Sequence, residues 1–400
     1  MKKNLLFVMP GLAAGGGEKS LVNLLSQIDY EQYNVDLFLF NHEGIFMDFL
    51  PKEVNVISLP ETYKLFTLPF AESVRRLAAA NRMSLVYNRF MFAFRNVRGR
   101  DISITEQYNW KHLSSSLEKL DKKYDAAIGF LEKTATYFCV DKVNADKKIG
   151  WVHIDYDKLG MDPDFDIKYF SELDHIVTVS EECASILKRR FPEQRDKVDV
   201  IYNIVSPRMI NQMVEHGERD VYGRKPDETV ILSIGRLHYQ KGFELAIEAC
   251  DRLVRQKHNV RWYVIGEGEE RSRLSQLIAK YRLEDRFILL GLKANPYPYI
   301  KQAHIYAQPS KFEGKSIAID EAKILNKPIV VTNFSTAKDQ ITDGYNGLIV
   351  EMSAAAVAEG IGRLISDDGL RNRLTANLAG EKLGTEQEIN KLYSLVGDVP

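Results

Sequence analysis

The sequence predicts an α/β protein built from two doubly wound parallel sheets in tandem. Short β-rich runs alternate with helical patterns along the chain, as in parallel sheets made of βαβ units. The alternation stops at a polar stretch near the middle and then begins again. The chain has 400 residues, more than one ordinary core holds, and this length suits two domains of roughly two hundred residues each.

Thirteen short runs are predicted to be strands, because each is β-rich and bounded by turn residues. Ligands of open parallel sheets bind beyond the carboxyl ends of the strands, so two facing domains would enclose a cleft. The first half is expected to hold the strands Leu5–Met9, Val35–Phe40, Val54–Ser58, Asp125–Phe130, Lys148–Val152, His175–Val179 and Val198–Tyr202. The second half is expected to hold Val230–Gly235, Arg261–Ile265, Phe287–Leu290, Ile305–Ala307, Pro328–Val331 and Gly347–Val350.

The domain junction is predicted in Ser206–Glu228, which is polar, contains two prolines and two glycines, and has no sheet pattern. The first domain is therefore expected to span residues 1–205 and the second residues 206–380. The remainder, 381–400, is expected to form a C-terminal helix that packs back on the first domain.

One segment, Thr62–Lys111, interrupts the alternation of strands and helices. It is rich in aromatic residues and holds nine lysines and arginines, Arg100 among them, against Glu72, Asp101 and Glu106. Two interpretations stay open. The segment is either an amphipathic helical insertion whose aromatic side chains pack internally, or a surface for an anionic or lipid-linked acceptor at a membrane face.

Composition narrows the class of protein. The apolar fraction of 45% and the charged fraction of 27% are those of a soluble globular chain. A formal net charge of −1 gives no global reason to expect nucleic acid as a partner. No apolar stretch approaches the roughly 18 residues of a membrane span. The first apolar run breaks at Pro10-Gly11 and is interpreted as a strand, not a signal peptide, so a cytoplasmic protein is expected.

The first strand is followed by a glycine-rich stretch, Gly11 to Lys19, which opens a helical pattern over Ser20–Ile28. Glycines there let the backbone approach a ligand, and the amides of a helix N-terminus can hold an anion. The spacing is not that of a dinucleotide-binding GxGxxG. A simple tight turn therefore stays open as an alternative.

The second half carries more specific motifs. Gly235-Arg236 follows a predicted strand, and Lys241-Gly242 leads into a helix. Two cations five residues apart at the mouth of a strand are suited to a diphosphate, because arginine offers a fork of donors and lysine a point charge. Further on, Glu313 and Glu321 lie eight positions apart, the first in a loop and the second on the helix that this loop opens. Both carboxylates can therefore face one cleft.

These motifs together resemble glycosyltransferase family 4, the large retaining family of the GT-B fold, also described as glycosyltransferase group 1. The resemblance runs from Gly15 to Gly347 and is most specific in the pair Glu313 and Glu321. It implies two Rossmann-like domains, the first binding the acceptor and the second the nucleotide sugar. The implied activity is a retaining, metal-independent hexosyl transfer in the biosynthesis of surface polysaccharide. The expected partners are a UDP-sugar donor and a saccharide or lipid-linked saccharide acceptor, with peripheral contact to the inner face of the membrane through residues 62–111.

The resemblance also implies a role for each site residue. Arg236 and Lys241 would bind the diphosphate, and Glu313 the hydroxyls of the donor sugar. Glu321 would hold the ribose, and His153 would contact the donor sugar from the first domain. The backbone would add donor contacts at Gly16 and Gly235, at Leu290 and Gly291 beside the base, and at Gly314, Lys315 and Ser316.

No metal and no cofactor besides the donor are expected, since no side-chain cluster has convincing ligand spacing. Asp155 and Asp157 do form a D-x-D, a metal-binding motif of the other major glycosyltransferase fold. Three other hypotheses about function stay open: a nucleotide-sugar epimerase on the GT-B scaffold, a catalytically inactive binding protein, and an NAD-dependent oxidoreductase. The last is suggested by the glycine-rich turn and by a Tyr-x-x-x-Lys from Tyr297 to Lys301.

Overall fold

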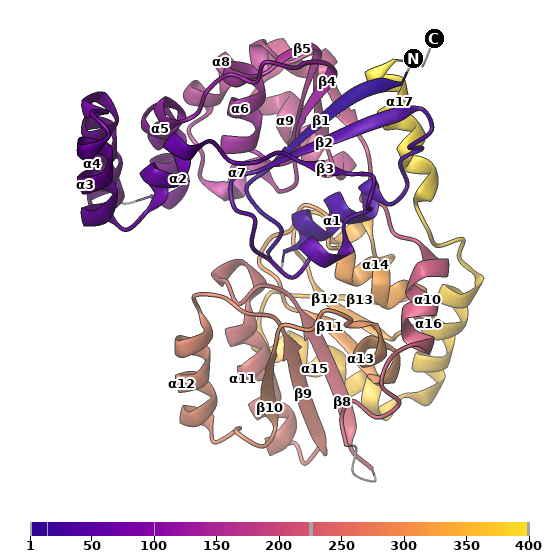
Figure 1. Ribbon diagram of the computed structural model, residues 1–400. Helices are drawn as coiled ribbons and strands as arrows, with labels where there is room; N and C mark the ends of the chain where they lie inside the picture. The colour runs from indigo at the N-terminus through magenta and orange to yellow at the C-terminus, as the bar shows by residue number, and fades with distance from the viewer. Residues whose placement is uncertain (1, 14, 100, 224–226, 398–400) are drawn as a thin grey trace. The chain divides into compact units, whose positions relative to one another are not determined.

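The structure is a computed structural model that describes residues 2–13, 15–99, 101–223 and 227–397 (Figure 1). The chain divides into two units. Unit 1 comprises Met1–Ala13, Leu21–Ile201 and Gln387–Pro400, and unit 2 comprises Ala14–Ser20 and Tyr202–Glu386. Each unit holds one parallel sheet, of seven strands in unit 1 and six in unit 2, so the predicted fold class and all thirteen predicted strands are confirmed.

The sheet of unit 1 reverses its strand order next to its first strand. Because β1 pairs with both β2 and β4, the point between β1 and β4 is the topological switch point of a doubly wound sheet. From edge to edge the strands are β3 (Asn55–Val56), β2 (Tyr33–Leu39), β1 (Lys3–Met9), β4 (Lys123–Gly129), β5 (Asn144–Val152), β6 (His175–Thr178) and β7 (Val198–Val200). The helices beside this sheet are α1 (Gly16–Leu25), α6 (Thr134–Lys142), α7 (Tyr156–Leu159), α8 (Pro163–Ser171) and α9 (Glu181–Arg190).

The aromatic and basic segment between β3 and β4 is helical. Phe66, Leu77 and Leu85 form a small core of its own, while several other aromatic side chains are exposed, so neither interpretation of the segment holds for all of its aromatics. Arg100 lies outside the described residues. The helices are α2 (Glu61–Thr67), α3 (Phe70–Ala79), α4 (Met83–Arg98) and α5 (Ile102–Leu113).

The sheet of unit 2 repeats the same strand order. Its switch point lies between β8 and β11, which pair directly. From edge to edge the strands are β10 (Phe287–Gly291), β9 (Val260–Ile265), β8 (Thr229–Ile234), β11 (Ile305–Gln308), β12 (Ile329–Thr332) and β13 (Leu348–Val350). The helices are α10 (Pro207–Glu215), α11 (Phe243–Arg255), α12 (Arg271–Tyr281), α13 (Tyr297–Gln302), α14 (Ile317–Ile324), α15 (Ala354–Ser366) and α16 (Asp368–Gly380).

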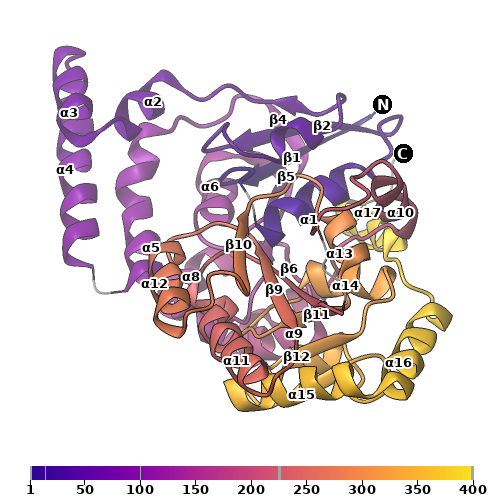
Figure 2. The same cartoon turned by 90° about the horizontal axis from the view of Figure 1, so that it is seen from below.

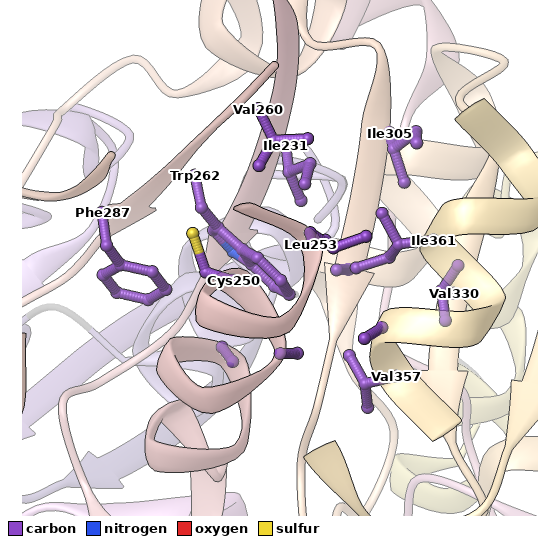
Figure 3. Close-up of a cluster of buried hydrophobic side chains, with 14 of the residues drawn as sticks. Ile231, Cys250, Leu253, Val260, Trp262, Phe287, Ile305, Val330, Val357 and Ile361 are labelled. Carbon is purple, nitrogen blue, oxygen red and sulfur yellow. The ribbon is translucent and has the colours of Figure 1, made fainter. Parts of the chain in front are cut away.

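Helices cover both faces of the unit 2 sheet, which explains why its strands are almost continuously apolar. Side chains of α11, α12, α15 and α16 pack on one face, and those of α10, α13 and α14 pack on the other. On the first face Cys250 of α11 lies between Trp262 and Phe287 (Figure 3). Burial raises the pKa of the Cys250 thiol to about 12, so it behaves as a small apolar side chain.

The division between the units differs from the expected junction. It falls between Ile201 and Tyr202, and the stretch expected to be a linker contains α10, which begins with Ser206 as its cap and Pro207 in its first turn. The polar outer face of α10 explains why it was not predicted, since Ile210 is its buried residue. Residues 224–226 of the same stretch lie outside the described residues.

The C-terminal helix is shorter than expected. Residues 381–388 hold only a 3-10 turn, and α17 spans Ile389–Val396 in unit 1. Gly384, with φ +127°, has a non-helical backbone, and a Cβ there would lie 2.7 Å from the Glu386 carboxylate and 2.9 Å from Pro207. Within unit 1 the ring of Tyr393 on α17 stacks on Tyr33 at 4.9 Å, and its hydroxyl accepts the Asp29 amide at 2.9 Å. Residues 398–400 lie outside the described residues.

No described helix combines the length and the apolar character that a bilayer crossing demands.

Candidate active site

Two neighbouring loops at the switch point of unit 2 carry the predicted cations and one predicted carboxylate. The loop after β8 holds Gly235, Arg236 and Lys241, and the loop after β11 holds Glu313. Because β8 and β11 are adjacent and parallel, their carboxyl ends open on the same edge of the sheet. Residues 72 positions apart in the sequence therefore meet there.

The carboxylate of Glu313 is buried and fully engaged. Its Oε1 accepts the Lys241 ammonium at 2.6 Å, the Ser310 hydroxyl at 2.6 Å and the Gln308 amide at 3.1 Å. Its Oε2 accepts the Gln240 amide at 3.3 Å. A buried carboxylate held by four donors from two loops keeps one orientation, which is what a group that positions a ligand requires.

Gly242 explains how Lys241 reaches this carboxylate. It has a left-handed conformation (φ +61°) between the short 3-10 turn Tyr239–Lys241 and α11. A Cβ at this position would lie 2.1 Å from the carbonyl oxygen of Pro309, so only glycine lets the two loops approach this closely. The Lys311 amide donates to the Gln240 carbonyl at 2.8 Å and ties the loops together.

Glu321 lies on α14 and is also buried. It accepts the Tyr297 hydroxyl at 3.1 Å and forms an ion pair with Lys19, whose ammonium lies 4.7 Å from the Tyr297 ring. Burial, together with the charge of Glu321, raises the pKa of Tyr297 well above its usual range. Burial and the charges of both Glu321 and Glu313 raise the pKa of Tyr306 on β11 well above its usual range.

The hydroxyl of Tyr297, the tyrosine of the Tyr-x-x-x-Lys motif, donates a hydrogen bond to Glu321. The sequence did not predict this contact.

The first turn of α1 belongs to unit 2 and adds two charges to this region. Lys19 is the partner of Glu321, and Glu18 lies 3.5 Å from Arg236. Burial raises the pKa of Glu18, and the positive charge of Arg236 opposes that rise. The Arg236 side chain is half exposed, so its guanidinium can meet a ligand. A Cβ on Gly16 would meet nothing within 4 Å, so the turn is open at this residue.

Glycines at the ends of three strands bring their backbones together. The Gly235 amide donates to Ile265 at 3.0 Å, and the Gly266 amide donates to Gly291 at 3.0 Å. A Cβ on Gly266 would lie 1.9 Å from the Gly235 oxygen. Leu290 and Gly291 therefore end β10 next to Gly266, and Gly266 in turn adjoins Gly235, where the loop of Arg236 begins.

Residues 314–316, which precede α14, make contacts within the protein. The Ser316 amide donates to Gln340 at 2.9 Å, and Gln340 returns a hydrogen bond to the Ser316 carbonyl at 2.8 Å. The Lys315 ammonium lies over the Tyr202 ring at 3.9 Å and 4.0 Å from Asp320. Gly314 stands between Glu313 and Lys315 in the same loop. The Ser316 amide is thus an internal hydrogen-bond donor.

His153 lies in unit 1, directly after β5. Its amide donates to Glu132 at 3.1 Å, and its ring lies 4.8 Å from Phe130. Burial lowers the pKa of the imidazole to about 3, partly opposed by a backbone hydrogen bond at Phe130, so the ring is neutral at physiological pH. Its Nε2 is buried and has no hydrogen-bond partner among the described residues.

The D-x-D pair is engaged in local structure. Asp155 caps α7 by accepting the Asp157 amide, and Asp157 pairs with Arg189 and Arg190. Among the described residues, no three His, Cys, Asp or Glu side chains gather as metal ligands would.

A family model described as glycosyl transferases group 1 matches residues 215–379. Residues 215–379 belong to this family. We call this stretch the group 1 domain. It contains Arg236, Lys241, Glu313 and Glu321, and it ends within α16.

Curated relatives share part of their length with this chain. An N-acetylgalactosamine-N,N′-diacetylbacillosaminyl-diphospho-undecaprenol 4-α-N-acetylgalactosaminyltransferase of Campylobacter jejuni is 29% identical over 204 residues, 50% of this chain and 53% of that protein. The α-D-kanosaminyltransferase of Streptomyces kanamyceticus is 29% identical over 164 residues, 40% of this chain and 42% of that protein. The chain thus spans about half the length of the curated relatives it matches.

Solved structures resemble the chain over nearly its whole length. A TarM variant of S. aureus, crystallised with fondaparinux, α-GlcNAc-glycerol and UDP, is 15% identical with a TM-score of 0.67, covering 99% of this chain and 100% of that one. HepE of Anabaena with UDP-glucose is 17% identical with a TM-score of 0.66, covering 98% and 99%. The chain therefore has the GT-B fold, and the group 1 domain is its second Rossmann-like half.

Sequence reasoning missed the side chains that hold the two glutamates. Gln308 and Ser310 hold Glu313, Gln340 holds the loop at Ser316, and Lys19 and Tyr297 hold Glu321. Gln308 and Ser310 could have been found, because they are polar residues at the end of the buried strand β11. The others come from distant elements of the sequence and carry no local signal.

Proposed function

We propose that this chain is a retaining glycosyltransferase that takes a sugar from a nucleotide-sugar donor. The observation that supports this most is the buried Glu313 carboxylate, held by Lys241 at the switch point beside the half-exposed Arg236. Such a carboxylate accepts hydrogen bonds from sugar hydroxyls. The loop that carries Lys241 also carries Arg236, and two cations in one loop can neutralise the charge that develops on a departing diphosphate.

In the proposed reaction the bond between the anomeric carbon and the diphosphate oxygen breaks, and a bond to an acceptor hydroxyl forms on the same face. The proton of the acceptor hydroxyl passes to an oxygen of the leaving diphosphate. The Lys241 ammonium has three N–H groups, of which one binds Glu313, so two can be donated to phosphate. The Arg236 guanidinium contributes further donors, and Glu321 holds the ribose hydroxyls.

We further propose a UDP-sugar as the donor and a saccharide or lipid-linked saccharide as the acceptor. UDP is present in the TarM crystal and UDP-glucose in that of HepE, and the name of the Campylobacter relative specifies an undecaprenol-linked acceptor. The charge of the diphosphate is met by Lys241 and Arg236, so the proposed reaction needs no metal ion. Turnover is therefore expected to persist in excess EDTA.

The test compares two lysines of similar exposure. In Lys241→Met the ammonium that would bind the diphosphate is lost. The control is Lys311→Met. The Lys311 ammonium pairs with Glu244, and the Lys241 ammonium pairs with Glu313. Removing a charge-assisted hydrogen bond costs about 1.5–3 kcal/mol, so Lys241→Met and Arg236→Ala should each weaken UDP binding about tenfold or more, measured by calorimetry. Lys311→Met should bind UDP like the wild type.

Equal UDP affinity in wild type, Lys241→Met and Arg236→Ala would reject this site. The anomeric configuration of the product, read by NMR, tests retention separately. An inverted product would leave the site in place and reject the retaining mechanism. Conversion of the donor to its epimer without transfer would favour the epimerase alternative.

A further inference from the structure

One face of α4 exposes a continuous apolar stripe. Its residues are three or four positions apart, the spacing that places side chains on one side of a helix. We call it the α4 stripe, and its members with their exposed fractions are Met83 (61%), Tyr87 (63%), Phe90 (49%), Phe94 (49%) and Val97 (86%). The edge of Phe90 meets the ring of Phe70 at 5.0 Å, which extends the stripe to the start of α3. Exposed aromatic side chains in such a row mark an interaction surface.

The rest of unit 1 contacts the opposite face of α4. Leu85 is buried in the small core with Phe66 and Leu77, and Phe92 packs against that core. His112 on α5 bonds the Asn88 side chain at 2.8 Å. Figures 1 and 2 both show α3 and α4 side by side at the margin of unit 1, joined to the sheet through α2 and α5. Within the described part of unit 1, the stripe therefore points away from the core that holds the helix.

Positive charge surrounds the stripe. Residues 62–111 hold nine lysines and arginines against three acidic residues, in a chain whose net charge is −1. The Arg98 guanidinium lies 4.4 Å from the centre of the Phe94 ring, at one end of the stripe, and Arg82 caps α4 at the other. Aromatic side chains on one face of a helix, flanked by arginines, match the apolar depth and the anionic headgroups of a bilayer surface.

We propose that the α4 stripe docks unit 1 on an anionic lipid bilayer, with Tyr87, Phe90 and Phe94 at the headgroup boundary and Arg82 and Arg98 on lipid phosphates. A second copy of the chain fits the surface less well, because two such segments of like charge would repel each other. The proposal is independent of the proposed function of unit 2, since lipid binding is measured without donor or acceptor.

The experiment uses the full chain and co-sedimentation with vesicles of phosphatidylglycerol and phosphatidylcholine. The wild type should bind these vesicles and not vesicles of phosphatidylcholine alone. The double variant Phe90→Glu/Phe94→Glu should bind at least about tenfold more weakly. The control is Tyr345→Glu in unit 2, whose side chain has the same exposed fraction as Phe94, 49%, and it should bind like the wild type.

The charges are tested separately. Arg98→Ser should weaken vesicle binding about fivefold, and raising the salt concentration from about 50 mM to about 500 mM should weaken binding of the wild type. Circular dichroism checks that each variant is folded, which is expected for substitutions of exposed side chains.

Three results would overturn the proposal. One is a wild type that does not bind anionic vesicles, and another is a double variant that binds them as well as the control does. The third is a wild-type oligomer in sedimentation velocity without lipid that the double variant converts to a monomer. That result would assign the stripe to a second copy of the chain.

Discussion

Glu313 and Glu321 are both buried carboxylates, but their partners differ. Glu313 is bound by Lys241 and by three uncharged donors that follow β8 or end β11, whereas Glu321 on α14 is bound by Lys19 of α1 and Tyr297 of α13. An interaction made mainly in the transition state lowers kcat when it is removed, while one made equally in the ground state weakens binding. The two residues should therefore separate in a kinetic experiment.

Glu313→Gln is expected to lower kcat by about 100-fold and to leave UDP affinity within about threefold, because the lost contact is to the sugar. Glu321→Gln is expected to weaken UDP itself by about 1.5–3 kcal/mol, because the lost bonds are to ribose. Calorimetry with UDP and steady-state kinetics with the full donor measure the two effects. Near-normal turnover in Glu313→Gln would remove this residue from the reaction.

The low pKa of His153 predicts how the free energy of unfolding of unit 1 changes with pH. Its pKa in the folded protein is about 3, below the value near 6.5 of an unfolded histidine, so only the unfolded chain gains this proton as the pH falls below about 6.5. The imidazole therefore destabilises unit 1 increasingly from pH 6.5 downward, by up to about 2 kcal/mol at pH 5. His153→Phe should not show this loss.

The measurement is urea unfolding at about pH 7.5 and about pH 5, above and below that unfolded-state pKa, in a Trp262→Phe background. The two remaining tryptophans, Trp110 and Trp151, then both report on unit 1. An equal decline of wild type and His153→Phe between these pH values would contradict the low pKa.

Among single residues, the sequence could predict Arg236, Lys241, Glu313 and Glu321 as candidate site residues, because their spacing near the ends of strands is the pattern that indicates such a site. It could not predict that Lys19 pairs with Glu321, or that Gln340 occupies the Ser316 amide. These contacts join residues far apart in the chain, and their side chains are of types that are commonly solvated.

Among the elements, the turn from Tyr239 to α11 depends on one glycine. Gly242 and Gly344 have nearly the same left-handed φ, +61° and +71°, but the space around them differs. A Cβ on Gly242 would lie 2.1 Å from the Pro309 oxygen, whereas a Cβ on Gly344 would meet nothing within 4 Å. The pair separates backbone strain from the collision between the two loops.

Gly344→Ala is expected to cost only the strain of a left-handed alanine, about 1 kcal/mol. Gly242→Ala should cost roughly 2–4 kcal/mol, because the loops must also move apart, and it should weaken UDP binding by displacing Lys241. Thermal unfolding followed by Trp262 fluorescence gives the stabilities. Equal stability of the two variants would show that the close approach of Gly242 to the Pro309 carbonyl does not restrict the side chain at this position.

Elements with a strong period were predictable and those without it were not. The buried strands have apolar runs bounded by turns, so all thirteen were found. α10 was missed because its outward face is polar, and the expected helix over 381–400 was too long because Gly384 ends any helical continuity before α17 begins. In α2–α5 exposed aromatic residues could not be distinguished from buried ones, because both kinds occur at helical spacing.

For the whole molecule, the C-terminal helix α17 belongs to the fold of unit 1. Tyr393 stacks on Tyr33 and binds the Asp29 amide, so Tyr393→Ala should destabilise unit 1 by about 2–4 kcal/mol. Unit 2 should be unaffected. Ser394→Ala, on the exposed side of the same helix, is the control and should change little.

The two unfolding transitions are read separately, through Trp110 and Trp151 for unit 1 and through Trp262 for unit 2. A loss of stability in unit 2, or none in unit 1, would show that α17 does not stabilise the unit with which it is grouped.

The long segment of unit 2, Tyr202–Glu386, is inserted into unit 1, and the short segment Ala14–Ser20 joins it from near the start of the chain. The chain leaves unit 1 after Ile201 and returns at Gln387, and Val205 and Thr385 exchange hydrogen bonds of 2.9 and 3.0 Å just inside unit 2. The ends of the fragment 202–386 are therefore neighbours, and so are the cut ends in unit 1, where Lys391 binds the Val200 carbonyl at 3.2 Å. The segment 202–386 can thus be exchanged between related chains with one pair of splice points and no new linker, and Ala14–Ser20, which supplies the Lys19 partner of Glu321, must be exchanged with it.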